Sequence, residues 1–464
     1  MRIIFLFVLI LCSKSAFCQC NCIDNFDSLS NSVEKNYIAF QQKIDSIGDY
    51  IQFKESVRKQ AFMQDGFKCY TLLKSYLTYF GDPHLNINLV GNKENQSALE
   101  SFFKNWPRAK ISKNEVMKYF QRNKLDNIEG IWEMKSLKTK VAIYRKSPGV
   151  RNFVAVIFES DSLLWDWGMV RMEIKKSNNL YSIVYYKKDH TPINSLAYIQ
   201  ENNLVIKGSG TWTKIYPNQV NSGNDKEGIS FHTLGNDASV VTINSFWISR
   251  RNEIDSLFGK NDSIISNRKY LLIDLRNNPG GHIMSTFSIL KYIYSNPILS
   301  DGLIVRSSPE NISIYQKIRN TPGFSSDDKS TFDSIILKMR LHPKSIVQVT
   351  ERDTMTFEKK MRNPIKVAIL TNETTLSAAE LFVLWAKQSA KVIIFGRQTG
   401  GALDYTEIGS ARNLPCPLYT FLCPMGTTYH EFIPLIDNVG IKPDVILNVG
   451  NQDWIKVAYE YLRK

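Results

Sequence analysis

The chain has 464 residues, of which 43% are hydrophobic and 22% charged, and its formal net charge is +14. This length predicts two or three domains, and the composition is that of a globular protein rather than a disordered chain. The Lys and Arg residues are scattered along the whole length and form no basic tail or stripe, so the charge does not indicate nucleic-acid binding.

Residues 1–18 have the layout of a signal peptide. One Arg precedes an apolar run from Ile3 to Cys12, and Ala16-Phe17-Cys18 supplies a cleavage site before Gln19. The run is short for a membrane span, and no later stretch approaches the roughly 20 apolar residues that a transmembrane helix needs. We therefore expect an exported protein without a stable membrane span, in the periplasm, the cell envelope or the extracellular space.

Export permits disulfide bonds. Of the seven cysteines, those that remain after the expected cleavage are Cys20, Cys22, Cys69, Cys416 and Cys423. Cys416 and Cys423 flank a short segment and are expected to pair with each other. Cys69 is expected to pair with Cys20 or Cys22, which leaves one thiol over. The spacings fit no zinc-finger pattern, so no metal site is expected.

Three regions follow the signal peptide. Residues 19–127 read as a mainly helical region, with apolar residues at helical spacing and a strand at 85–91. Residues 128–216 change to a period of two between polar turns, which predicts an antiparallel β domain, either a small barrel or a sandwich. The composition of residues 217–228 is that of a linker.

Strands alternate with helices in residues 229–464, which predicts a mostly parallel sheet. Buried strands are expected at 269–276, 366–372 and 391–396, and residues 307–345 are expected to form an irregular, mobile insertion. The fold class is therefore α/β: a core with a mostly parallel sheet, preceded by a helical region and an antiparallel β domain.

Two segments of this core have both a structural and a catalytic reading. Ser377-Ala-Ala-Glu380 follows the strand at 366–372 and is the capping box that begins many helices. The same helix N-terminus offers free N–H groups, which a tetrahedral oxyanion needs. Asn277-Asn278-Pro279-Gly280-Gly281 would make a tight turn without any function, yet paired glycines also let amides face a ligand. Taken alone, each segment is better explained as local structure.

Taken together, DLRNNPGG, SAAE, FGRQTGG and VGIKPDVIL occur in an order that resembles the C-terminal-processing and tricorn-core serine peptidases over residues 235–450. The resemblance implies that Ser377 is the nucleophile. It also implies an oxyanion hole made by the amide of Ala378 and one from Gly280 or Gly281.

The two branches of this family differ in the base that activates the serine. The processing proteases use a lysine after the serine, but Gly400, Gly401, Ala402 and Leu403 stand at that place here. The tricorn-like branch takes a histidine from an N-terminal segment, and Gly81-Asp82-Pro83-His84 resembles that motif. The resemblance therefore implies His84 as the general base.

An acid is expected to orient His84. The family position shortly before Gly440 holds Asp437, where relatives usually have Glu, so Asp82 and Glu407 remain alternatives. No metal, Walker or dinucleotide motif is present, and no cofactor is expected. The β domain stands where relatives carry a PDZ module and is a candidate for substrate docking.

The predicted function is that of an exported serine peptidase that acts on peptides or proteins through a Ser377 acyl-enzyme. The alternative is a catalytically inactive ligand- or peptide-binding protein on the same fold. An esterase would normally show G-x-S-x-G, which is absent around Ser377.

Overall fold

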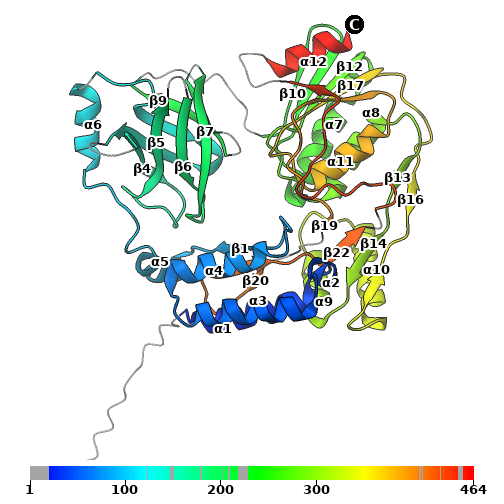
Figure 1. Cartoon of the computed structure of the whole chain (residues 1–464). Helices are drawn as coiled ribbons and strands as arrows, with labels where there is room; N and C mark the ends of the chain where they lie inside the picture. The colour runs from blue at the N-terminus through cyan, green and yellow to red at the C-terminus, as the bar shows by residue number, and fades with distance from the viewer. Residues whose placement is uncertain are drawn as a thin grey trace, which may run out of the picture.

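The computed structural model describes residues 20–464 except 123, 147–150, 178–179, 201, 207–208, 218–227, 407–408, 410, 429 and 448–452. The expected signal peptide at 1–18, most of the expected linker, and Glu407 lie outside the described residues. Figure 1 shows a β-barrel on one side, an α/β core on the other, and the N-terminal helices in a layer beneath both.

The N-terminal layer consists of helices whose apolar faces share one core. The long helices are Cys22–Asn36 (α1), Ile47–Ala61 (α3) and Gly66–Thr78 (α4), and the short ones are Phe40–Lys43 (α2) and Gln96–Phe102 (α5). Lys113–Arg122 (α6) packs on the β-barrel instead. Apolar residues at helical spacing form the buried cluster, among them Phe26, Leu29, Val33, Leu73 and Leu77. The helical region expected at 19–127 is therefore present.

One strand ties this layer to the C-terminal half of the chain. Asn86–Leu89 (β1) follows α4 and pairs antiparallel with Tyr419–Leu422 (β21), with Ile87 opposite Phe421. Arg412–Asn413 (β20) pairs with the other edge of β21. The turn before β1 is thereby fixed against residues that lie far away in the sequence.

The antiparallel β domain is a closed barrel, one of the two forms expected. Its strands are Gly130–Met134 (β2), Thr139–Arg145 (β3), Phe153–Ser160 (β4), Val170–Ser177 (β5), Leu180–Tyr186 (β6), Pro192–Gln200 (β7), Asn203–Ile206 (β8) and Gly210–Tyr216 (β9). Each strand pairs with the next in the chain, and β9 pairs with β2 to close the barrel. Closure removes the edge strands that a small sheet would otherwise expose.

The α/β core contains a six-stranded sheet in the order β10-β11-β12-β17-β18-β23. These strands are Ser230–Leu234 (β10), Ala238–Thr242 (β11), Tyr270–Asp274 (β12), Lys366–Thr371 (β17), Val392–Gly396 (β18) and Val445–Ile446 (β23). Only β10 runs antiparallel to its neighbour, so the mostly parallel sheet is confirmed.

Helices cover both faces of this sheet, because its strands are apolar on both sides. One face of the sheet packs against Arg251–Ser266 (α7), Phe287–Ile293 (α8) and Ala378–Lys387 (α11), and the other against Trp454–Leu462 (α12). Along β12, Leu271 and Ile273 face the first group, whereas Leu272 faces α12. This two-sided burial is typical of parallel sheets.

Residues 307–345 are not irregular, contrary to the sequence-based expectation. They contain Pro309–Arg319 (α9) and Ser326–Leu341 (α10), which pack on each other and on short strands of the core. Apolar residues at helical spacing form their buried contacts, including Ile314, Phe332, Ile335, Ile336 and Met339. The many charged residues between them lie on the outer faces and concealed this periodicity. The short strands around them are Ile298–Ser300 (β13), Leu303–Arg306 (β14), Ile346–Gln348 (β15), Asp353–Met355 (β16), Tyr405–Thr406 (β19) and Gly426–Thr428 (β22).

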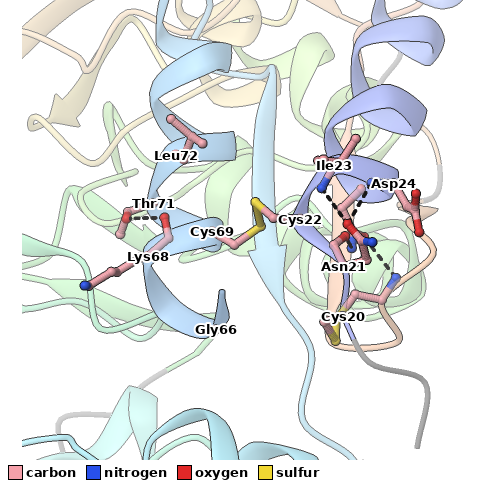
Figure 2. Close-up of a disulfide and its surroundings, with 12 residues drawn as sticks. Cys20, Asn21, Cys22, Ile23, Asp24, Gly66, Lys68, Cys69, Thr71 and Leu72 are labelled. Carbon is pink, nitrogen blue, oxygen red and sulfur yellow. Dashed lines mark hydrogen bonds between the residues drawn. A yellow bond between two sulfur atoms is a disulfide. The ribbon is translucent and has the colours of Figure 1, made fainter. Parts of the chain in front are cut away.

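The disulfide pairing differs in part from the expectation. Cys22 bonds to Cys69, one of the two partners expected for Cys69, and joins α1 to α4 (Figure 2). Cys20 bonds to Cys416, and Cys423 is a buried free thiol. The expected Cys416–Cys423 bond is wrong because β21 lies between the two residues, and an extended strand rises about 3.3 Å per residue. That separation exceeds the roughly 7 Å between Cα atoms that a disulfide can span.

None of the helices in the described part of the chain is long and apolar enough to cross a membrane.

A buried histidine joins the barrel to the helical layer. The His190 ring lies between the rings of Trp165 and Phe103, at centroid distances of 3.6 and 3.9 Å. Its Nε2 lies 2.7 Å from the Leu164 carbonyl oxygen. Burial lowers the pKa of His190 from 6.5 to about 3, so the folded protein keeps this ring neutral.

This burial predicts an acid-sensitive contribution to stability. Between pH 6.5 and about 3 the unfolded chain binds a proton at His190 that the folded chain does not, so stability falls as the pH falls. His190→Phe keeps the stacked ring and removes the titration. The free energy of unfolding of wild type should drop more steeply between pH 6.5 and pH 4 than that of the variant, by about 1.4 kcal/mol per pH unit. Urea titrations across this range measure it, and parallel pH dependences would refute it.

Candidate active site

Ser377 lies between β17 and α11 with an unusual backbone conformation. Its φ is 55° and its ψ −123°, a region that side chains other than glycine rarely occupy. Such strain costs on the order of 1–3 kcal/mol and persists only where surrounding contacts impose it. The half-buried Ser377 side chain is thereby presented on a sharp strand-to-helix turn.

The loops after β12 and β17 lie side by side because these strands are parallel neighbours. The Leu376 N–H donates to the Asn278 carbonyl at 3.0 Å, and Thr374 Oγ1 donates to Asn277 Oδ1 at 2.8 Å. The carboxyl ends of adjacent strands thus bring the expected serine and the expected glycine pair together.

Gly280 is in direct contact with the serine turn. A Cβ on Gly280 would lie 2.8 Å from the Ser377 Cβ and 2.9 Å from the Ala378 nitrogen, and Gly280 has a φ of 89°. Both the close approach and the positive φ require glycine at this position.

The two glycines differ in the direction of their amides. The Gly280 N–H donates to Asn278 Oδ1 at 2.9 Å and is therefore occupied. Gly281 forms a parallel bridge with Phe246, in which Phe246 binds the backbone of the residues on either side of Gly281. The N–H of the exposed Gly281 therefore points away from Phe246. Ala378 begins α11, where the first N–H groups have no acceptor within the helix.

His84 lies in the turn between α4 and β1. Its N–H donates to Asp82 Oδ1 at 2.8 Å, and Asp82 Oδ2 accepts from the Tyr37 hydroxyl at 2.7 Å. Burial raises the pKa of Asp82, while Tyr37 and His84 oppose this rise. Asp82 therefore holds the backbone of the turn rather than the ring. Nδ1 of His84 is buried and has no hydrogen-bond partner in the described part of the chain.

Asp437 lies on a loop that reaches the His84 turn. Its Oδ1 accepts from the N–H groups of Leu403 and Asp404 at 2.6 and 2.8 Å. Its Oδ2 is buried and has no partner among the described residues. Burial raises the pKa of Asp437 and nearby Asp404 adds to the rise, whereas the backbone N–H groups and His84 lower it. The next residue, Asn438, donates through Nδ2 to the Gly81 carbonyl at 2.9 Å.

The structure therefore gathers the expected residues into two groups. Ser377, Ala378, Gly280 and Gly281 form one, and His84 with Asp437 forms the other. Within the described residues, no hydrogen bond joins the Ser377 hydroxyl to the His84 ring.

The lysines near the serine in sequence lie elsewhere in the core. Lys387, at the end of α11, pairs with Asp444, and Lys391 Nζ donates to the Met361 carbonyl at 2.6 Å. The described residues contain no cluster of His, Cys, Asp and Glu that could hold a metal ion.

Sequence reasoning missed two buried acids beside these groups. Glu380 is seen in the sequence only as part of a capping box, and its carboxylate does accept the Ser377 N–H at 3.0 Å. Its side chain is nevertheless completely buried, which a capping residue on the surface would not be. Asp404 belongs to no motif and could not have been singled out.

Comparison with known proteins identifies the class of this molecule. Residues 237–447 match the model of peptidase family S41, and this region contains the serine turn, the glycine pair and Asp437. The protein is thus a serine-type peptidase, a hydrolase whose substrates are peptides or proteins. The similarity to peptidase family S41 is shown for residues 237–447.

Two solved structures of CPAF support the same fold over nearly the whole chain. A point mutant of CPAF aligns with 13% identity and a TM-score of 0.51 over 96% of both chains. Mature CPAF complexed with lactacystin aligns with 14% identity and a TM-score of 0.50, over 95% of this chain and 97% of that one. A putative peptidase from Parabacteroides merdae aligns with 14% identity and a TM-score of 0.45, over 96% and 97%. No curated protein matches the chain.

The contact between Gly280 and Ser377 predicts that a methyl group added at residue 280 lowers the stability of the protein. Gly280→Ala should lower the free energy of unfolding by about 1–3 kcal/mol, because it adds strain at positive φ and displaces the serine turn. Gly259→Ala is the matched control: Gly259 lies inside α7, and a Cβ there would meet nothing within 4 Å. That control should raise stability by roughly 0.5–1 kcal/mol. Chemical denaturation measures both, and equal effects of the two variants would contradict the contact.

Proposed function

We propose that the protein is an exported serine peptidase in which Ser377 is the nucleophile, His84 the general base and Asp437 the acid that orients it. One observation carries the assignment of the base and the acid. Nδ1 of His84 and Oδ2 of Asp437 are buried atoms of complementary chemistry that lack partners in the described residues. Buried polar atoms are rarely left unpaired, and the lowering effect of His84 on the pKa of Asp437 supports this pairing.

In the proposed reaction, His84 Nε2 takes the proton of the Ser377 hydroxyl as its oxygen attacks a peptide carbonyl carbon. Asp437 accepts from Nδ1 and stabilises the imidazolium that forms. The amine leaves with the proton from His84, and water then releases the acyl group from Ser377. Hydrogen bonds between base and nucleophile are often long before a substrate binds, so the separation of the two groups is compatible with this scheme.

The negative charge on the tetrahedral intermediate needs fixed donors. We assign them to the N–H of Ala378, at the positive end of α11, and the N–H of Gly281. Gly280 has a different role, because its N–H is already occupied and its missing Cβ lets the serine turn approach.

Export is supported by the pattern of residues 1–18 and by the two disulfide bonds, which persist in oxidising compartments. Glycine, alanine and leucine at 400–403, instead of a lysine, favour a histidine base over a Ser-Lys dyad.

A fluorophosphonate probe tests the nucleophile. The probe should label wild type and fail to label Ser377→Ala, and His84→Ala should slow labelling strongly because the hydroxyl loses its base. Ser325→Ala is the control: Ser325 caps α10, so its loss should cost about 1 kcal/mol of stability and leave labelling unchanged. Mass spectrometry of the tryptic digest locates the adduct. Folded wild type that resists the probe would instead favour a binding protein without catalysis.

A further inference from the structure

Glu380 binds the nucleophile turn and a distant loop at once. It lies in the first turn of α11 and is fully buried. Its Oε1 accepts from Thr399 Oγ1 at 2.6 Å and from the Gly401 N–H at 2.8 Å. Its Oε2 accepts from the Ala402 N–H at 2.8 Å and from the Ser377 N–H at 3.0 Å.

The partners of Glu380 require a carboxylate. Every one of the four donates, and only an ionised carboxyl accepts on both oxygens without offering a proton. A glutamine at this position would turn an NH₂ group toward two of these donors. No Lys or Arg in the described residues forms an ion pair with Glu380, so its charge is stabilised by these donors alone.

Asp404 and Asp437 bind each other's backbone. Asp404 Oδ1 accepts from the Ile436 N–H at 2.8 Å, and its Oδ2 accepts from the Asp437 N–H at 2.9 Å. In return, Asp437 Oδ1 accepts from the N–H groups of Leu403 and Asp404. Asp404 is only 4% exposed, so this reciprocal clamp is shielded from water. The clamp fixes the Asp437 carboxylate through Oδ1, and leaves Oδ2 free of partners among the described residues and available for the proposed reaction.

The clamp continues to the turn that carries the base. The Asn438 N–H donates to the Gly401 carbonyl at 2.9 Å, and its Nδ2 donates to the Gly81 carbonyl at 2.9 Å. The neighbouring Asp82 in turn accepts the His84 N–H. Hydrogen bonds to the carboxylates of Glu380 and Asp404 therefore connect the Ser377 turn, the loop around residue 401 and the Asp437 loop. The Asn438–Gly81 bond extends this path to the His84 turn.

We propose that Glu380 and Asp404 are positioning residues of the peptidase site. They fix the position of the nucleophile, Ser377, relative to the base, His84, although the two residues lie far apart in the sequence. This inference rests on the proposed roles of Ser377 and His84. Neither residue contacts the reacting atoms in this assignment. A displacement of about 1 Å at such a site can cost on the order of 100-fold in rate, so the clamps act on the rate of the chemical step rather than on binding.

Fluorophosphonate kinetics test the proposal without knowledge of the natural substrate. Glu380→Gln and Asp404→Asn should each lower the maximal labelling rate constant about 100-fold, and leave the half-saturating probe concentration within about threefold. Because both variants interrupt one path, the double variant should be slowed far less than the product of the two single effects.

Two further variants separate positioning from general stability. Asp189→Asn removes a partly buried carboxylate that accepts from Tyr70, Lys74 and Thr191 between the barrel and α4. It should lower the melting temperature and leave the labelling rate unchanged. Asn438→Gly suits the φ of 62° at this residue and removes only the Nδ2 bond to Gly81, so it should fold normally and label about tenfold more slowly.

The outcomes distinguish this inference from the proposed function. Wild type that the probe does not label at Ser377 overturns the proposed function, and the positioning role with it. Labelling of wild type at Ser377, with wild-type rate constants for Asn438→Gly and for the folded Glu380 and Asp404 variants, overturns the positioning role alone. A change only in the half-saturating concentration also refutes it.

Discussion

The backbone of Ser377 is the constraint on which the site depends. At φ 55° this turn is unfavourable for a serine, so surrounding contacts must impose it. Gly280 supplies the space, Asn278 accepts the N–H of the preceding residue through its carbonyl, and Glu380 accepts the N–H of Ser377 itself. The parallel pairing of β12 and β17 places all of these at one edge of the sheet. The strain is therefore balanced by contacts that also position the N–H groups we propose as oxyanion donors.

A second constraint positions the His84 turn beside the Asp437 loop. The pairing of β1 with β21 and the Cys20–Cys416 bond join the N-terminal layer to the C-terminal half of the chain. The Asn438–Gly81 hydrogen bond then sets the local contact between the two loops. Strand pairing positions the turn coarsely, and hydrogen bonds to buried groups refine it. The carboxylates of Asp82, Glu380 and Asp404 are buried, where unpaired charge is costly, and each accepts hydrogen bonds there.

The sequence predicts the parts of this structure that arise from local periodicity. Apolar runs and turn residues predict the strand, loop and helix around Ser377 and the glycine turn. Alternating apolar and polar residues predict the antiparallel β domain. His84 could be singled out only through a family motif, because no local pattern tells which distant segments meet. Asp404 gave no signal, since its partners are backbone groups of a loop far along the chain. The sequence-based pairing of Cys416 was wrong because the strand between Cys416 and Cys423 becomes evident only in three dimensions. The helices α9 and α10 were missed because charged residues conceal their buried faces in the sequence.

A crystal structure of the protein with a phosphonate attached to its serine would show whether Ser377, His84 and Asp437 act together. We expect the adduct on Ser377, with His84 Nε2 within about 3 Å of the serine oxygen and His84 Nδ1 bound to Asp437. We also expect the phosphonyl oxygen to accept from the N–H groups of Ala378 and Gly281. A His84 ring that remains out of reach of the modified serine, or an adduct on another residue, would contradict these roles.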